Sequence, residues 1–98
     1  MATILREREG AVVVLTLNRP DKLNALNAEL LGELETALVE TSRDGGVSCA
    51  IVTGAGDKAF AAGADIGAMV ELSTEEARAF SERGHRVCAL IECAPFPV

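Results

Sequence analysis

The sequence predicts an α/β fold in the order β-hairpin, helix, parallel strand, loop and helix, and three observations carry this prediction. Apolar and polar residues alternate loosely up to a glycine turn, and a run rich in valine and leucine follows it. Two later segments repeat apolar residues at three- and four-residue spacing, which is typical of helices. A short apolar run lies between them. With 98 residues, we expect one domain, covering residues 1–98.

The hairpin is expected at the start of the chain. Residues 4–8 form its first strand, Glu9 and Gly10 its turn, and residues 11–18 its second, largely buried strand. The segment 19–21 ends this strand, because its proline cannot donate to a sheet ladder.

The first helix is expected to begin after Asn27, a favourable capping residue, and to run to about Ser42. Residues 44–46, Asp-Gly-Gly, stop it. The continuous apolar run 47–53 predicts a parallel strand covered on both faces of its sheet. The buried face of this helix is expected to contain Leu30, Leu34, Ala37, Leu38 and Thr41.

The second helix is expected to begin at a capping box, in which Ser73 and Glu76 satisfy each other's backbone N–H groups. Pro95 and Pro97 end this helix. Its buried stripe is predicted to contain Ala77, Phe80, Gly84, Val87, Cys88 and Ile91.

Composition excludes several functional classes. The formal net charge of −6 argues against nucleic acid as a partner and, more weakly, against anionic membranes. The start of the chain does not resemble a signal peptide and no apolar run is long enough to span a bilayer, so we expect a cytoplasmic protein. Cys49, Cys88 and Cys93 predict three reduced thiols, two of them buried. His85 is the only histidine and is expected on a helix surface, so no metal site is predicted.

The glycine-rich stretch TGAGDKAFAAGADI, residues 53–66, raises two hypotheses. Residues 54–59 fit the loose dinucleotide fingerprint G-x-G-x-x-A, but that site needs a helix to open at once, and the next helix cap is Ser73. The spacing of a phosphate-binding P-loop is also missing. We therefore expect Gly54 and Gly56 only to turn the chain out of the sheet.

The second half of the stretch, residues 61–66, favours a different site. Small side chains let a ligand lie against the main chain, and Gly63 permits backbone conformations that other residues resist. Backbone N–H groups in such a loop can form an oxyanion hole. The alternative is a tightly packed loop in which small residues merely fit.

Three segments together resemble the N-terminal part of the enoyl-CoA hydratase/isomerase family, the crotonase superfamily. They are residues 14–26 (VLTLNRPDKLNAL), 50–54 (AIVTG) and 58–66 (KAFAAGADI). The resemblance covers essentially the whole chain. It implies the N-terminal part of a crotonase-like spiral of ββα turns, apparently truncated, and an acyl-CoA thioester as substrate.

The resemblance also implies site residues. Ala64 is expected to supply, through its backbone N–H, the first of two donors to the thioester oxygen. On one side, the adenine and pantetheine of CoA are expected to pass Ala62, Gly63, Ala64, Asp65 and Ile66. On the other side lie Lys22, Leu23 and Ala25. Lys22 is either a phosphate contact or a solvated loop lysine. Gly67 stands where many relatives carry a polar residue, which puts one charged CoA contact in doubt.

The implied reaction is that of a lyase of fatty acid metabolism, which adds water to a 2-enoyl-CoA. No cofactor is implied beyond the coenzyme A of the substrate, and the full-length protein is expected to be a homotrimer or hexamer. The second donor and two acid/base glutamates are implied beyond residue 98, so the 98-residue chain is expected to be inactive alone. The alternatives are double-bond isomerisation, dehalogenation or thioester hydrolysis by the same superfamily, or a non-catalytic interaction fragment.

Overall fold

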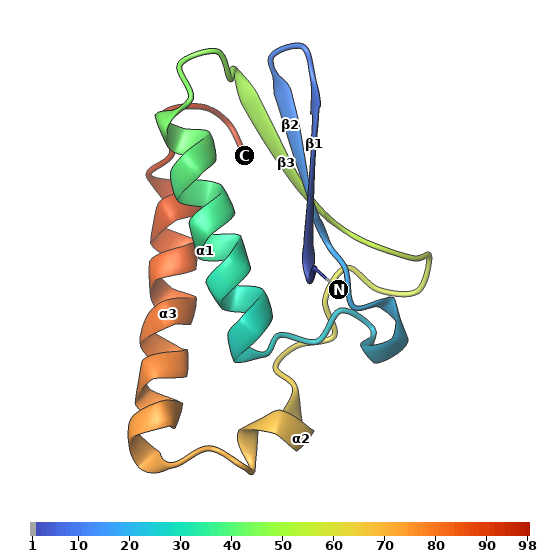
Figure 1. Cartoon of the computed structure of the whole chain (residues 1–98), viewed down its shortest axis with the longest axis vertical. Coiled ribbons are helices and arrows are strands. Elements are labelled where there is room, and N and C mark those ends of the chain that lie inside the picture. Colours follow the sequence, from blue (N-terminus) through green and yellow to red (C-terminus); the bar gives the residue numbers. More distant parts are fainter. Residues whose placement is uncertain (1) are drawn as a thin grey trace.

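The sheet in the computed structural model, which describes residues 2–98, is built from the hairpin and one later strand (Figure 1). Strands β1 (Ile4–Glu9) and β2 (Val12–Leu17) pair antiparallel around a turn in which Gly10 has a φ of 59°. Strand β3 (Cys49–Gly54) pairs parallel to β2, which gives the order β1-β2-β3. The predicted hairpin and parallel strand are confirmed. Met1, which the predicted domain includes, lies outside the described residues.

Two long helices lie together on one side of the sheet (Figure 1). Helix α1 (Ala28–Arg43) begins where the Asn27 side chain accepts a hydrogen bond from the Leu30 N–H at 2.9 Å. Helix α3 (Thr74–Glu92) begins at the predicted capping box and packs against α1. The core fills the space between β2, α1 and one line of α3, with Val13, Leu15, Leu17, Leu30, Leu34, Leu38 and Val87 among its buried residues.

Strand β3 differs from its prediction in two ways. It begins at Cys49, while Val47 is buried in the turn before it. The prediction that both faces of this strand are covered is wrong: Ala50 on the helix side is 1% exposed, whereas Ile51 on the opposite side is 46% exposed. An apolar run is compatible with burial but does not show how many layers cover it. In this chain the helices cover only one face of the sheet.

The predicted stripe of α3 is only partly buried. Val87 is buried, Phe80, Gly84 and Ile91 are half-buried, and Ala77 and Cys88 are exposed. A helix that packs mainly against one other helix buries a narrow line of residues, so positions at the edge of the stripe stay exposed.

The three cysteines are free, as predicted, but the prediction that two are buried is wrong. Cys88 and Cys93 are exposed near the end of α3, and Cys49 is half-buried in β3. His85 is exposed on α3, as predicted.

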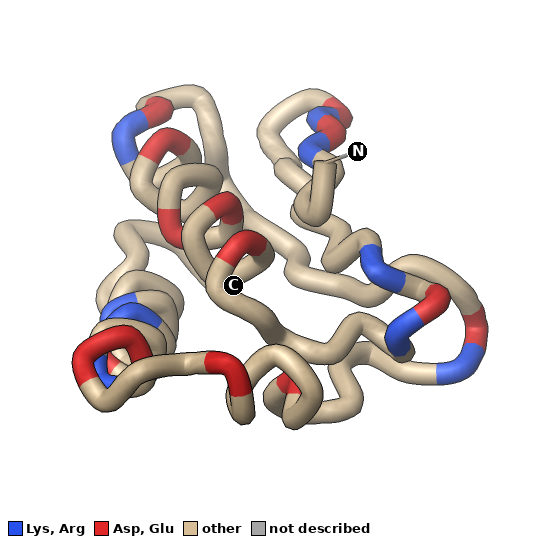
Figure 2. The backbone as a smooth tube through the Cα atoms, turned by 60° about the horizontal axis from the view of Figure 1, so that its bottom comes forward, with Lys and Arg blue, Asp and Glu red and all other residues tan. Residues whose placement is uncertain are grey.

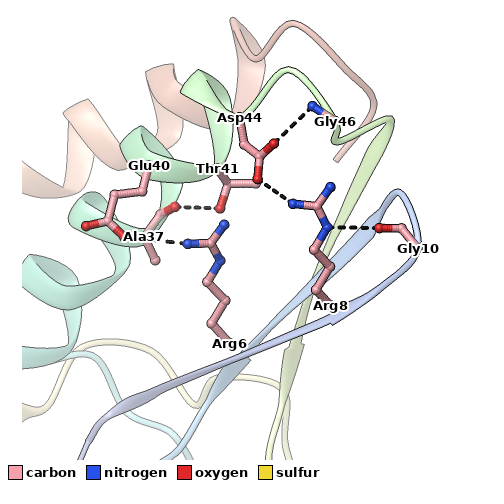
Figure 3. Close-up of polar contacts among 8 residues, drawn as sticks. All are labelled: Arg6, Arg8, Gly10, Ala37, Glu40, Thr41, Asp44 and Gly46. Atoms are coloured by element: carbon pink, nitrogen blue, oxygen red, sulfur yellow. Dashed lines mark hydrogen bonds and ion pairs between the residues drawn. The ribbon is translucent and has the colours of Figure 1, made fainter.

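Polar contacts hold the hairpin against the end of α1 (Figure 3). Arg8 donates to the Gly10 carbonyl at 2.9 Å and forms an ion pair with Asp44, while Arg6 lies 3.5 Å from Glu40. The Gly46 N–H donates to Asp44 at 2.9 Å. This hydrogen bond and the Arg8 guanidinium lower the pKa of the Asp44 carboxyl below its ordinary value of 3.8. These contacts position the turn that leads into β3.

Two short elements were not predicted: a 3-10 turn at Pro20–Lys22 and helix α2 (Ile66–Met69). Each is close to the minimum length of its type, so neither leaves a periodic pattern in the sequence. The 3-10 turn lies in the connection from β2 to α1, and α2 lies in the connection from β3 to α3 (Figure 1). Among the described residues, no helix is both long and apolar enough to cross a membrane.

Candidate functional site

The loops that follow β2 and β3 meet beyond the same edge of the sheet. The two strands are parallel and end in register at Leu17 and Gly54, so their loops leave side by side. An isolated parallel bridge joins Leu26 to Ala64. Its bonds run from the Leu26 N–H to the Gly63 carbonyl at 2.7 Å and from the Asp65 N–H to the Leu26 carbonyl at 2.8 Å.

This bridge sets the direction of the Ala64 N–H. In a trans peptide the carbonyl and the following N–H point in opposite directions. Because the Gly63 carbonyl accepts from Leu26, the Ala64 N–H is directed away from Leu26. Within residues 2–98, no hydrogen bond from this N–H is found. The loop reaches this geometry with Gly63 at a φ of 108°, a left-handed region that favours glycine.

Ala64 also borders an apolar hollow of about 410 Å³ between the loops and α3. The loops and strands contribute mainly aliphatic and aromatic side chains to it, and His85, Ser81 and Cys88 are its polar or reactive members. No carboxylate is found among the described residues that line it. Its apolar lining includes Leu17, Leu26, Val52, Phe60, Phe80, Val87 and Ile91.

Asn24 ties the two loops together, a role the sequence reasoning missed. Its side chain is fully buried and accepts from the Arg19 N–H at 2.9 Å. Its amide donates to the carbonyls of Ala55 at 2.9 Å and Ala59 at 3.0 Å. The φ of Asn24 is 57°, a left-handed conformation that asparagine tolerates better than most residues. An asparagine between apolar neighbours just after a proline turn was the available signal.

Gly54 does more than turn the chain. A Cβ added there would lie 2.5 Å from the Phe60 carbonyl oxygen and 2.8 Å from the Asn24 amide nitrogen. The loop therefore folds back over the end of β3 at a distance that only glycine permits. The prediction that Gly54 only turns the chain out of the sheet is incomplete. A local sequence pattern does not show that a later segment approaches this glycine closely. Gly56 has a φ of 83° and fits its expected role in the turn.

Arg19 forms a second connection between the loops. Its guanidinium donates to the Ala25 carbonyl and, at 3.0 Å, to the Asp65 carboxylate. Asp65 also caps α2 by accepting from the Ala68 N–H at 3.2 Å. The Ala68 hydrogen bond and then the Arg19 side chain lower the pKa of Asp65 below its ordinary value of 3.8. The Asp65 side chain is therefore an ionised structural link.

The structure places the two predicted groups of CoA-contacting residues side by side. The Ala62 N–H donates to the Leu23 carbonyl at 3.0 Å, and the Leu26 to Ala64 bridge continues this contact. Figure 2 shows charges of both signs on the turns that follow β2 and β3 and none along β3 itself. In the loop after β2, Lys22 and Leu23 are exposed and Ala25 is half-buried. In the segment after β3, Asp65 is half-buried, and the exposed residues are Ala62, Gly63, Ala64 and Ile66.

The family model for enoyl-CoA hydratase/isomerase matches residues 12–98. The chain belongs to this family. The match contains both loops of the candidate site, and it confirms the resemblance found in the sequence.

Known members of the family agree in sequence and in fold. The short-chain-enoyl-CoA hydratase of Clostridium acetobutylicum is 44% identical over 97% of this chain and 36% of its own length. The mitochondrial 3-hydroxyisobutyryl-CoA hydrolase of Rattus norvegicus is 44% identical over 71% of this chain and 18% of its own. The crystal structure of enoyl-CoA hydratase from Mycobacterium smegmatis superposes with a TM-score of 0.93 at 35% identity, covering 100% of this chain and 38% of that one.

The chain thus spans just over a third of the length of these two hydratases. Its order of strands and helices is that of the N-terminal portion of the crotonase fold, as predicted.

Proposed function

We propose that this chain forms the N-terminal part of an enoyl-CoA hydratase site and contributes the Ala64 N–H to its oxyanion hole. The observation that carries the proposal is the direction of this N–H. It points away from the bridge that holds its loop, and no described group accepts from it. A backbone donor held in this way is preorganised for charge that develops on a substrate oxygen.

The chemistry of hydration calls for such a donor. When water adds to the β-carbon of a 2-enoyl thioester, the electron pair of the double bond moves toward the carbonyl and an enolate oxygen develops negative charge. Hydrogen bonds to that oxygen strengthen as the charge grows, so they lower the barrier. A proton then returns to the α-carbon. The oxyanion hole needs a second N–H, which we assign to a part of the protein outside these 98 residues.

The apolar hollow beside Ala64 is where we place the acyl group. Its lining consists mainly of aliphatic and aromatic side chains, which favours a hydrocarbon tail next to the thioester. The CoA portion would pass over the exposed main chain of residues 62–66 on one side and Lys22, Leu23 and Ala25 on the other. Lys22 is exposed and free to approach a phosphate.

We propose that the isolated 98-residue chain binds thioester without turning it over. Hydration needs one group to activate water and another to deliver a proton. The described lining of the hollow offers no carboxylate for either task. The whole protein is proposed to act as a homotrimer or hexamer in the cytoplasm, in fatty acid metabolism. Family membership supports the role in fatty acid metabolism.

Two substitutions at one position test the role of Ala64. Proline has no N–H, so Ala64→Pro is expected to weaken binding of butyryl-CoA about fivefold to tenfold, the effect of one hydrogen bond. Ala64→Ser keeps the N–H and serves as the matched control. Calorimetric titration measures both. Equal affinity of the proline and serine variants would show that this N–H makes no contact with the thioester.

Amide exchange separates binding from a purely structural role. Butyryl-CoA is expected to slow exchange at residues 62–66, while exchange in the core of α1 stays unchanged. Unchanged exchange at 62–66 would favour the non-catalytic interaction fragment. Mass detection of 3-hydroxybutyryl-CoA after incubation with crotonyl-CoA checks turnover, and product above background would overturn the proposed inactivity of the chain.

Thioester hydrolysis is the second candidate, because a relative from Rattus norvegicus that is 44% identical over 71% of this chain is named a hydrolase. Hydrolysis also develops negative charge on the thioester oxygen, so the same donor serves both reactions. Free CoA formed by the whole protein would distinguish hydrolysis from hydration.

A further inference from the structure

We propose that Arg19 is a positioning residue that orients and polarises the Ala64 N–H through two peptide groups joined by a hydrogen bond. The proposal rests on the oxyanion role proposed above for Ala64, and it adds a residue whose guanidinium hydrogen-bonds to Ala25 and Asp65. Its basis is an unbroken series of contacts between the loops that follow β2 and β3.

The series begins at the guanidinium. Arg19 donates to the carbonyl of Ala25. The same peptide group carries the Leu26 N–H on its opposite side, and this N–H donates to the Gly63 carbonyl at 2.7 Å. The Gly63 carbonyl in turn shares its peptide group with the Ala64 N–H. A positive charge at one end is therefore linked, through two peptide groups, to the donor at the other end.

Each link strengthens the next. A carbonyl that accepts a hydrogen bond draws electron density across its peptide group, which makes the N–H of that group a better donor. Chains of hydrogen bonds gain on the order of 10–30% in strength per bond in this way. The Arg19 side chain is only 15% exposed, so water screens its charge less than it would at an open surface.

Asp65 holds the guanidinium in place. Its carboxylate accepts from the second terminal nitrogen of Arg19 at 3.0 Å, and its N–H donates to the Leu26 carbonyl at 2.8 Å. The two terminal nitrogens of Arg19 thus donate to residues on both sides of the bridge between Leu26 and Ala64: to Ala25 on one side and to Asp65 on the other. A lysine places one ammonium group on a flexible stem and lacks the planar fork that spans both acceptors.

Nuclear magnetic resonance on the ligand-free chain tests the series directly. Arg19→Met removes the charge, and Arg19→Lys keeps it without the fork. The amide protons of Leu26 and Ala64 are expected to shift upfield in both variants, more in Arg19→Met. Exchange of the Leu26 amide is expected to accelerate about fivefold to tenfold. Arg8→Met is the matched control, because Arg8 pairs with Asp44 at the opposite end of the sheet.

Infrared spectroscopy of a bound thioester tests the consequence for the site. Butyryl-CoA labelled with ¹³C at the carbonyl is expected to show a band at lower wavenumber when bound than when free, since a strong donor weakens the carbonyl bond. This displacement is expected to shrink in Arg19→Lys and further in Arg19→Met, and to stay unchanged in Arg8→Met. A merely structural arginine would lower affinity without moving the band of the thioester that still binds.

The outcomes separate the two proposals. If the wild-type chain binds no thioester, the proposal that the isolated chain binds it is wrong, while the amide shifts still decide whether Arg19 is coupled to Ala64. If the Leu26 and Ala64 amides respond to Arg19→Lys no more than to Arg8→Met, the coupling is wrong even where thioester binds. Should Arg19→Met fail to fold, the lysine variant supplies the same comparison.

Discussion

Asn24, Arg19 and Gly54 hold the two loops in their arrangement, and none of them is a predicted contact of the substrate. Asn24 supplies three hydrogen bonds to backbone groups, and Arg19 bridges Ala25 and Asp65. Gly54 contributes by lacking a side chain where Phe60 passes. These contacts hold the loops, and the bridge between Leu26 and Ala64 directs the Ala64 N–H.

Substitution of Gly54 tests how tightly the loop is packed. Gly54→Ala is expected to lower the free energy of unfolding by about 2 kcal/mol or more, because its Cβ would meet backbone oxygen 2.5 Å away. Gly45→Ala is the matched control, since a Cβ there meets nothing within 4 Å; a change below about 1 kcal/mol is expected. Urea unfolding measures both. Equal effects would show that the loop moves aside without cost.

Helix α3 is held at its start by a capping box and along its length by pairing with α1. The Ser73 N–H donates to Glu76 at 2.9 Å, and the Glu76 N–H donates to the Ser73 hydroxyl at 3.1 Å. Farther along, Arg83 and Arg86 both contact Glu35 of α1, at 3.3 and 2.8 Å. These contacts orient the helix whose side chains line the hollow beside Ala64.

The capping box predicts a pH dependence. The Ser73 N–H, and then its hydroxyl, lower the pKa of Glu76 below its ordinary value of 4.5. Since the folded-state pKa is the lower one, the contribution of Glu76 to stability is fully present above pH 4.5 and is lost as pH falls through the folded-state pKa.

Glu76→Gln keeps an acceptor for the Ser73 N–H but does not titrate. The urea midpoint, followed by circular dichroism between pH 7 and pH 3, is therefore expected to fall less steeply in this variant than in wild type. In Glu75→Gln, one residue earlier in the same turn, the fall of the urea midpoint with pH is expected to be closer to that of wild type. Identical slopes for wild type and Glu76→Gln would show that the box does not contribute to acid sensitivity.

The whole chain has a core on one face of its sheet only. Leu15 and Val13 are fully buried toward the helices, whereas Ile51 and Leu5 lie on the open face and are 46% and 41% exposed. The solved structures that superpose on this chain do so over 36–42% of their own chains. Stability of the 98-residue chain must therefore come from one sheet face and two helices.

This asymmetry predicts unequal effects of two substitutions in neighbouring strands. Leu15→Ala is expected to lower the free energy of unfolding by about 3 kcal/mol, since it leaves a cavity in the core. Ile51→Ala removes a side chain that is already 46% exposed, and a loss of less than about 1.5 kcal/mol is expected. Urea unfolding compares them. A comparable loss at Ile51 would indicate that the open face is covered in solution.

Local chemistry was enough to predict the elements themselves. The hairpin, α1, β3 and α3 follow from periodicity, caps and turn residues, because each depends on neighbours a few positions away. The family resemblance came from motifs of the same local kind, and the family match confirms it. The predicted contacts of CoA and the oxyanion role of Ala64 remain proposals for the experiments above.

Contacts between distant segments could be read only from the folded chain. The hydrogen bond of Asn24 to Ala55 joins positions 31 residues apart, and that of Arg19 to Asp65 joins positions 46 residues apart. The same holds for the open face of β3 and the exposure of Cys88, where an apolar pattern predicted burial. A sequence pattern records what a residue is able to bury, whereas packing of the other elements determines whether anything covers it.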